Sequence, residues 1–153
     1  MIDHDVRNCD YVKVPEPLAE TVDASIVGHM ERYYNTATRP IPGQPTLIYR
    51  YMKGVGFDVH HDEVTDIEVC RAQQSGQPVI GGNVTALLFL NDPDKYVGGE
   101  LYFEHPVELE VRPPSGTLVS FPATRDYLHG VRPIRAGERY SLLVRYTADL
   151  RSR

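Results

Sequence analysis

His60 and Asp62 are two residues apart. Residues 57–61 have the composition of a β-strand, and Asp62 directly follows them. Because the side chains of a strand alternate between its faces, His60 and Asp62 point the same way and His61 points the other way. An imidazole and a carboxylate on one face can both reach a single metal ion. A surface histidine beside an aspartate gives the same pattern, so a metal site requires a further ligand from elsewhere in the chain.

His129 is the candidate for that further ligand. It opens a predicted strand, 129–133, after the loop 122–127. Two histidines and one carboxylate that converge on a β framework would form the facial triad typical of non-haem Fe(II) oxygenases, in which the other coordination positions stay open. A closed structural zinc site is less natural, because it takes four protein ligands and neither Cys9 nor Cys70 is close in sequence to these three residues.

Arg139 and Ser141 share one face of a later predicted strand, and Tyr140, Leu142 and Val144 share the opposite face. A guanidinium group beside a hydroxyl group is suited to binding a carboxylate, since arginine offers paired donors that match its two oxygens. A salt bridge near the start of the strand would explain the arginine equally well. A position inside the fold would favour ligand binding, because a buried arginine needs a partner.

Residues 17–34 form the one convincing helix in the sequence. An apolar residue recurs at every fourth position, which defines one stripe along the helix: Leu18, Val22, Ile26 and Met30. We therefore expect an N-terminal helix that packs this stripe against the core.

From Pro40 onward, short β-branched and aromatic runs alternate with Gly, Pro, Asn and Asp, which is typical of many closely spaced strands. This pattern predicts a mainly β fold, a double-sheet jelly roll that occupies residues 46–147, with the helix packed against it. The polar stretch 63–82 is long for a loop in a compact domain, so we expect it to be either disordered or a functional lid. The strand candidates are 46–52, 57–61, 83–90, 100–104, 108–112, 117–121, 129–133 and 139–147.

The overall composition limits the classes of function. The chain has 153 residues, which fits a single domain over 1–153, and its formal net charge is −5. An acidic balance without a Lys/Arg cluster argues against a nucleic-acid partner. The chain has no apolar run of membrane-spanning length, and its acidic first residues are unlike a signal peptide. We expect a cytoplasmic protein with two thiols rather than a disulfide; its oligomeric state is left open.

The segment 50–62, RYMKGVGFDVHHD, resembles the R-Y-x-x-G-x-x-[YF]-x-x-H-x-D block of the prolyl 4-hydroxylase-like branch of the 2-oxoglutarate/Fe(II)-dependent dioxygenases. The resemblance continues in the family's order through TALLFLN at 85–91, GGELYF at 98–103, HGV at 129–131 and GER at 137–139. It covers residues 46–147, which makes it far more specific than any single motif. The fold it implies is the double-stranded β-helix.

The resemblance assigns His60, Asp62 and His129 to iron. It assigns Arg139 to the distal carboxylate of 2-oxoglutarate, with Ser141 as a second donor, and places Tyr51 in the wall of the co-substrate pocket. The sequence departs from the family pattern at Phe89, where many members have a tyrosine, and at Leu101, where a threonine is usual.

The activity implied by the resemblance is hydroxylation coupled to decarboxylation of 2-oxoglutarate. Its cofactors would be Fe(II), 2-oxoglutarate and O2, with ascorbate as an optional addition. The substrate would be a small molecule, an amino acid or a peptide, with a prolyl group among the candidates. Two alternatives stay open at this point: a cupin-like metalloprotein with a different reaction, and a non-catalytic ligand-binding jelly roll.

Overall fold

The computed structural model describes residues 9–63, 73–76 and 82–149. Within these residues, and apart from a helical turn at 73–75, the chain forms one α-helix, one short 3-10 helix and twelve strands. The helices are α1 (Leu18–Tyr34) and η1 (Pro93–Lys95). The strands are β1 (Asp10–Lys13), β2 (Thr38–Pro40), β3 (Leu47–Tyr51), β4 (Phe57–His60), β5 (Val84–Phe89), β6 (Tyr96–Gly98), β7 (Leu101–Phe103), β8 (Leu109–Val111), β9 (Leu118–Pro122), β10 (His129–Val131), β11 (Ile134–Gly137) and β12 (Arg139–Ala148).

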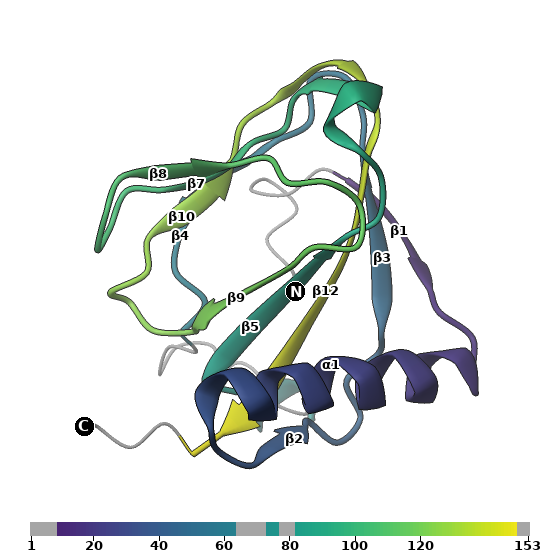
Figure 1. Ribbon diagram of the computed structural model, residues 1–153, viewed down its shortest axis with the longest axis vertical. Coiled ribbons are helices and arrows are strands. Elements are labelled where there is room, and N and C mark those ends of the chain that lie inside the picture. The colour runs from purple at the N-terminus through teal and green to yellow at the C-terminus, as the bar shows by residue number, and fades with distance from the viewer. Residues whose placement is uncertain (1–8, 64–72, 77–81, 150–153) are drawn as a thin grey trace.

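Two antiparallel sheets lie opposite one another in the fold (Figure 1). The larger sheet has the order β1-β3-β12-β5-β9, with β2 also paired to β12, and the smaller sheet has the order β4-β10-β7-β8. Between the sheets, Leu87 and Phe89 of β5 form one apolar cluster with Leu101 and Phe103 of β7. A separate ribbon of β11 and β6 closes one end. This arrangement confirms the predicted jelly roll.

Strand β12 carries different chemistry on its two faces. Leu142, Val144 and Tyr146 are buried against α1 on the outer face of the large sheet. Arg139 and Ser141 are buried on the inner face, toward the small sheet. The alternation predicted from the sequence is therefore confirmed, and both polar residues lie inside the barrel.

Helix α1 packs against the core, as predicted, and covers the outer face of the large sheet. The apolar stripe that the sequence predicts for it is only partly confirmed. Ile26 and Met30 are buried, whereas Leu18 is 56% exposed and Ala19 is buried instead. A helix has about 3.6 residues per turn, so a stripe of every fourth residue drifts by about 40° at each step and by about 120° over three steps. Leu18 has therefore rotated away from the sheet that Met30 faces.

A buried hydrogen bond fastens α1 to the sheet. Tyr146 is fully buried, and its hydroxyl donates to Oδ1 of Asp23 over 2.8 Å. Thr46 donates to the other oxygen of the same carboxylate over 3.3 Å. Burial raises the pKa of Tyr146, and the Asp23 carboxylate raises it further, so this phenol stays protonated and donates.

All eight predicted strands are present, each shifted by no more than two residues at either end. Four strands were missed, namely β1, β2, β6 and β11, because each has only three or four residues and lacks a clear alternation. Most of the predicted lid, 63–82, and Cys70 lie outside the described residues. Neither helix in the described part of the chain is long and apolar enough to cross a membrane.

Gly98 and Gly99 let the chain turn tightly beside Arg139. Both have a positive φ, 82° and 69°, which side-chain-bearing residues rarely adopt. A Cβ atom on Gly98 would lie 2.2 Å from the carbonyl oxygen of Pro133, and one on Gly99 would lie 2.5 Å from Cδ1 of Ile134. The two glycines of the GGE motif thus have a steric role next to the arginine.

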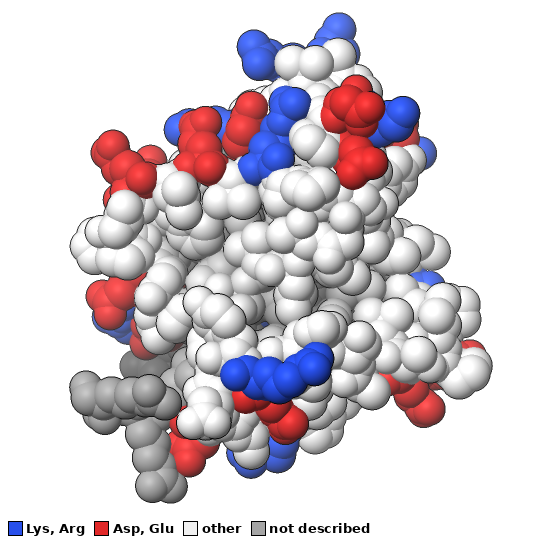
Figure 2. All heavy atoms as spheres, viewed as in Figure 1, with Lys and Arg blue, Asp and Glu red and all other residues white. Residues whose placement is uncertain are grey.

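Charged side chains on the face shown in Figure 2 lie mainly around its periphery, and positive and negative groups are interspersed there. The middle of this face is largely uncharged. The view therefore shows no continuous basic surface of the kind that follows a nucleic-acid backbone.

Candidate metal centre

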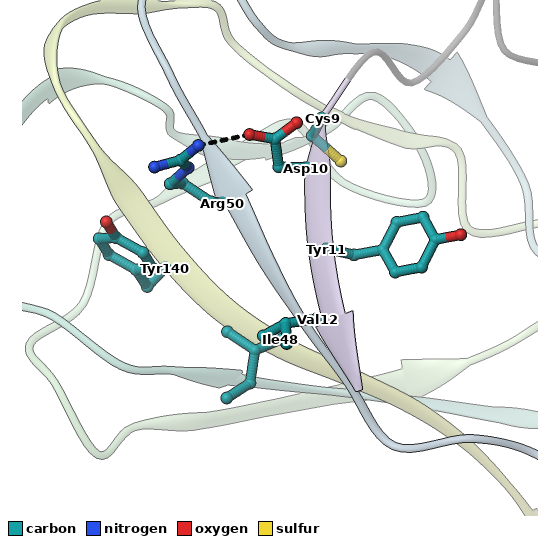
Figure 3. A pocket seen from close by; sticks show the side chains of 7 residues that line it. All are labelled: Cys9, Asp10, Tyr11, Val12, Ile48, Arg50 and Tyr140. Carbon is teal, nitrogen blue, oxygen red and sulfur yellow. Dashed lines mark hydrogen bonds and ion pairs between the residues drawn. The ribbon is translucent and has the colours of Figure 1, made fainter. Parts of the chain in front are cut away.

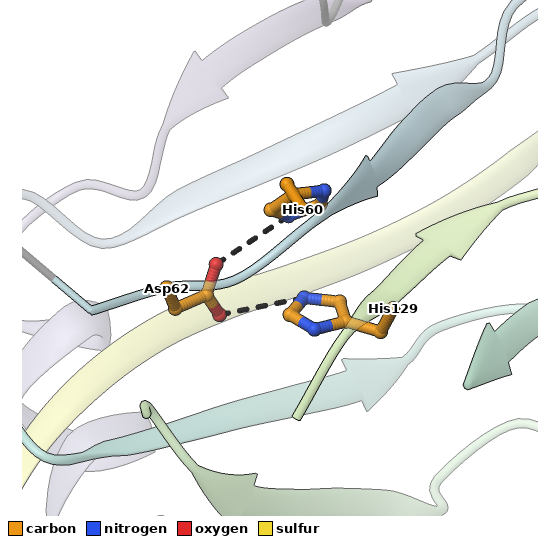
Figure 4. A group of neighbouring side chains, drawn as sticks. All are labelled: His60, Asp62 and His129. Atoms are coloured by element: carbon orange, nitrogen blue, oxygen red, sulfur yellow. Dashed lines mark ion pairs between the residues drawn. The ribbon is translucent and has the colours of Figure 1, made fainter. Parts of the chain in front are cut away.

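His60, Asp62 and His129 come together between the two sheets (Figure 4). His60 ends β4 and His129 begins β10, and the two residues are directly opposite in the pairing of these strands. Nε2 of His60 lies 3.4 Å from Oδ1 of Asp62, and Nε2 of His129 lies 3.5 Å from Oδ2. One ligand atom from each side chain lies within 4.8 Å of the other two, a spacing that one metal ion can bridge.

Backbone carbonyl groups orient both imidazole rings. Nδ1 of His60 donates to the carbonyl oxygen of Asp58 over 2.7 Å, and Nδ1 of His129 donates to that of Tyr127 over 2.8 Å. A carbonyl oxygen can only accept, so Nδ1 carries the hydrogen in each ring. Nε2 of each ring faces Asp62 and is the atom with which the ring could bind a metal ion.

Aromatic side chains hold the two rings from the other directions. The ring of Phe57 meets His60 at a centroid distance of 3.8 Å, nearly edge-on. Phe121 and Phe103 lie 4.6 Å and 5.7 Å from the ring of His129. This packing restricts ring rotation and limits the access of water on that side.

Asp62 is 5% exposed and is surrounded by polar partners. Thr85 donates a hydrogen bond to Oδ2 over 2.7 Å, and Nη2 of Arg145 forms an ion pair with Oδ1 over 3.3 Å. Burial by itself would raise the pKa of this carboxyl, but the hydrogen bonds and positive charges around it outweigh that effect and hold the pKa of Asp62 well below its usual range. Asp62 is therefore an ionised carboxylate, ready to coordinate.

The protonation of His129 fits the same purpose. Burial lowers the pKa of His129, and the nearby Asp62 carboxylate opposes this effect only in part. The ring is thus neutral at pH 7. Two imidazole nitrogens and one carboxylate oxygen are a donor set that suits Fe(II), and three protein ligands leave further positions for a co-substrate. The residues present therefore fit the metal that the sequence predicts.

Arg139, Ser141 and Tyr51 lie together on the inner face of the large sheet. Arg139 is opposite Tyr51 in the pairing of β12 with β3, and Ser141 is opposite Phe89 of β5. Arg139 and Ser141 are each 1% exposed, and the guanidinium carbon lies 5.1 Å from the ring centre of Tyr51 and 4.8 Å from that of Phe89. The burial that would favour ligand binding over a surface salt bridge is therefore present.

A groove elsewhere on the molecule is separate from these residues. It has a volume of about 560 Å³ and lies beside β1, where Asp10 and Arg50 form an ion pair (Figure 3). Tyr140 lines it, and Tyr140 is on the opposite face of β12 from Arg139. The groove is therefore outside the barrel.

Residues 46–146 match the sequence model of the 2OG-Fe(II) oxygenase superfamily. The chain belongs to this superfamily. A PKHD-type hydroxylase of Xanthomonas campestris pv. campestris (strain 8004) is 33% identical over 135 residues, which are 85% of this chain and 57% of that protein. A PKHD-type hydroxylase of Methylobacterium nodulans is 37% identical over 113 residues, 71% of this chain and 45% of that protein. The oxygenase chain thus spans about half the length of these relatives.

Solved structures support the fold of this oxygenase. A prolyl hydroxylase of Trichoplax adhaerens, in complex with a peptide fragment of hypoxia inducible factor, has a TM-score of 0.65 and 22% identity, covering 93% of this chain and 64% of that one. A prolyl-4-hydroxylase of Pseudomonas putida has a TM-score of 0.63 and 21% identity, covering 95% of this chain and 74% of that one. At this level of identity the comparison shows the shared fold.

Three further residues lie at the candidate site and were not singled out from the sequence. Thr85 and Arg145 both contact Asp62, and Tyr96 is buried with Tyr51 in one cluster. Burial raises the pKa of Tyr96, while the positive charges of Arg139 and Arg112 act to lower it. A signal existed for Arg145, since it shares the face of β12 that carries Arg139. Thr85 and Tyr96 become visible only through the pairing of distant strands.

Proposed function

We propose that this chain is a hydroxylase that uses Fe(II) and 2-oxoglutarate, with the metal held by His60, Asp62 and His129. The observation that carries the proposal is the convergence of three donor groups within 4.8 Å, in a chain of the 2OG-Fe(II) oxygenase superfamily. The buried Arg139 on the adjacent sheet adds a group suited to a co-substrate carboxylate.

Each residue has a defined task in this proposal. His60 and His129 supply nitrogen ligands whose rings are fixed by carbonyl groups, and Asp62 supplies a negative charge that offsets part of the metal charge. Arg139 binds the distal carboxylate of 2-oxoglutarate with its paired donors, and Ser141 donates beside it. Tyr51 forms a wall of the same pocket.

The bound metal, with 2-oxoglutarate and O2, supplies the oxidising chemistry that hydroxylates a C–H bond, while 2-oxoglutarate is converted to succinate and CO2. The contribution of the chain is to position these groups and to exclude water around them. The aromatic rings against both histidines serve that exclusion.

The proposed substrate is a small molecule, an amino acid or a peptide, and a prolyl group is among the candidates. Support for hydroxylation comes from the hydroxylase names of the relatives, and support for a prolyl group comes from those of the solved structures. We place the protein in the cytoplasm and include ascorbate among the additives to be tested.

The test is release of succinate from 2-oxoglutarate in the presence of Fe(II), with and without O2. We expect turnover that requires O2 and that is lost in His60→Ala, Asp62→Ala and His129→Ala. His29→Ala is the matched control, because His29 lies on α1 and pairs with Arg32 there. Turnover that survives all three ligand substitutions would refute the metal assignment. Metal binding without any effect of 2-oxoglutarate would instead indicate the cupin-like alternative, and binding of both without succinate would indicate a non-catalytic module.

A further inference from the structure

A second arginine reaches the metal centre from the same strand as Arg139. Arg145 lies six residues further along β12, on the same face, and it is opposite Thr85 in the pairing with β5. Its Nη2 atom is 3.3 Å from Oδ1 of Asp62, and its side chain is 26% exposed. The guanidinium group therefore extends from a metal ligand to solvent.

The backbone at Arg145 is fixed, so the side chain starts from a defined place. The amide group of Gln44 accepts from the backbone N–H of Arg145 over 3.0 Å and donates to its carbonyl oxygen over 2.8 Å. These two bonds lie at the end of β12, where the strand also pairs with β2. Arg145 is thus held by the sheet rather than by a loop.

Among the residues that the structure describes, the charges at the centre favour an anion beside Arg145. With a divalent metal and dianionic 2-oxoglutarate bound, the described side chains Asp62, Arg139 and Arg145 bring the net charge to +1. Asp62 carries one negative charge, which it shares between the metal and Arg145. Glu63, the next carboxylate in the chain, accepts from the backbone N–H and from Nε of Arg125 over 2.9 Å and 3.0 Å. A cation in a partly buried site beside a metal is costly unless an anion pairs with it.

We propose that Arg145 binds a carboxylate of the primary substrate, so that the substrate is a small carboxylic acid such as a free amino acid. This inference rests on the proposed function and narrows its substrate class. One uncompensated positive charge matches a monoanionic carboxylate better than a dianionic phosphate. Arginine also presents paired donors at the spacing of the two oxygens of a carboxylate. A residue inside a peptide has no main-chain carboxylate and would leave Arg145 uncompensated.

The test compares pairs of compounds that differ only in this charge: L-amino acids and their carboxamides. Wild-type protein with Fe(II), 2-oxoglutarate and O2 is assayed for product heavier by one oxygen atom. We expect at least one acid to be hydroxylated and its amide to have a kcat/KM lower by about 10- to 100-fold, the range for one charged pair. Aspartate and asparagine, compared in the same way, separate a side-chain carboxylate from the α-carboxylate.

Arg145→Gln is expected to reduce this discrimination to within about threefold, because the amide side chain has no charge to pair. Arg135→Gln, which removes an exposed arginine on β11, is the matched control and should retain it. Affinity for Co(II), measured without O2, gives a readout independent of activity. Loss of a neighbouring cation should leave Co(II) affinity unchanged or higher. Weaker Co(II) binding with unchanged discrimination would show that Arg145 only positions Asp62.

Three outcomes overturn the inference: equal use of acid and amide, acid preference that persists in Arg145→Gln, and a panel that gives no product although 2-oxoglutarate is turned over without added substrate. If a peptide with blocked ends is hydroxylated but no free acid is, the inference is likewise overturned. Failure of the proposed function is distinct from these results, since it appears as no O2-dependent succinate at all from the wild-type protein.

Discussion

Replacement of Arg139 by methionine should separate binding of the co-substrate from binding of the metal. The side chain is 1% exposed and lies against the rings of Tyr51 and Phe89, so solvent does not screen its interaction with a bound carboxylate. A charged hydrogen bond contributes about 1.5 to 3 kcal/mol. Arg139→Met removes two such hydrogen bonds, and the hydroxyl of Ser141 replaces them in part. The net cost should be about 3 kcal/mol, which corresponds to a loss of about 100-fold in affinity for 2-oxoglutarate.

The stability of the ligand-free protein should respond differently. Methionine is apolar and close to arginine in length, and it removes a cation that is expensive to bury. We therefore expect the free energy of unfolding of Arg139→Met to stay within about 1 kcal/mol of wild type or to rise. Arg139→Lys keeps the charge but loses the paired donors, so its affinity for 2-oxoglutarate should be intermediate.

The measurement is calorimetric titration of 2-oxoglutarate into the Co(II)-loaded protein without O2, with urea unfolding of the metal-free protein alongside. Arg135→Met serves as the control, since Arg135 is exposed on β11. An affinity of Arg139→Met within about threefold of wild type would refute the role of this arginine. A large loss of stability would show instead that its burial serves packing.

Three further predictions concern the support of the site and the fold. Thr85→Val removes the hydrogen bond to Asp62 and should weaken Co(II) binding about tenfold, as measured by competition with a chelator; unchanged affinity would contradict it. Tyr146→Phe leaves Asp23 without its buried donor and should lower the free energy of unfolding in urea by about 1 to 2 kcal/mol, whereas an equal midpoint would count against the fastening of α1. Gly98→Ala forces a clash at a positive φ and should destabilise the protein by about 3 kcal/mol or more, so a normal melting temperature would be inconsistent with the described turn.

Much of the fold was predictable because its strands alternate strongly. The eight longer or more apolar strands were found, and the two faces of β12 were assigned correctly from Tyr140, Leu142 and Val144 against Arg139 and Ser141. Strands β1, β2, β6 and β11 were not found, since each combines a length of three or four residues with no clear alternation of apolar and polar side chains. Leu18 was misplaced because a four-residue spacing only approximates the helical period.

The site was predictable where its residues are close in sequence or belong to a known motif. The HxD spacing brought His60 and Asp62 together, the strand pattern offered His129 and Arg139 as further candidates, and the resemblance assigned a role to all four. The partners of Asp62 were out of reach, because Thr85 and Arg145 approach it through the pairing of β5 with β12. Strand order and register are set by the whole chain, so contacts of this kind cannot be read from local spacing.

The two histidines of the centre have one more property in common. Each ring is steered by the carbonyl group two residues before it in the chain, at Asp58 for His60 and at Tyr127 for His129. A main-chain oxygen stays in place whatever side chain its residue bears. Positions 58 and 127 can therefore change without retuning the imidazoles beside them. In the proposed hydroxylase, residues next to the metal ligands could therefore change with the substrate while both imidazole rings keep their orientation.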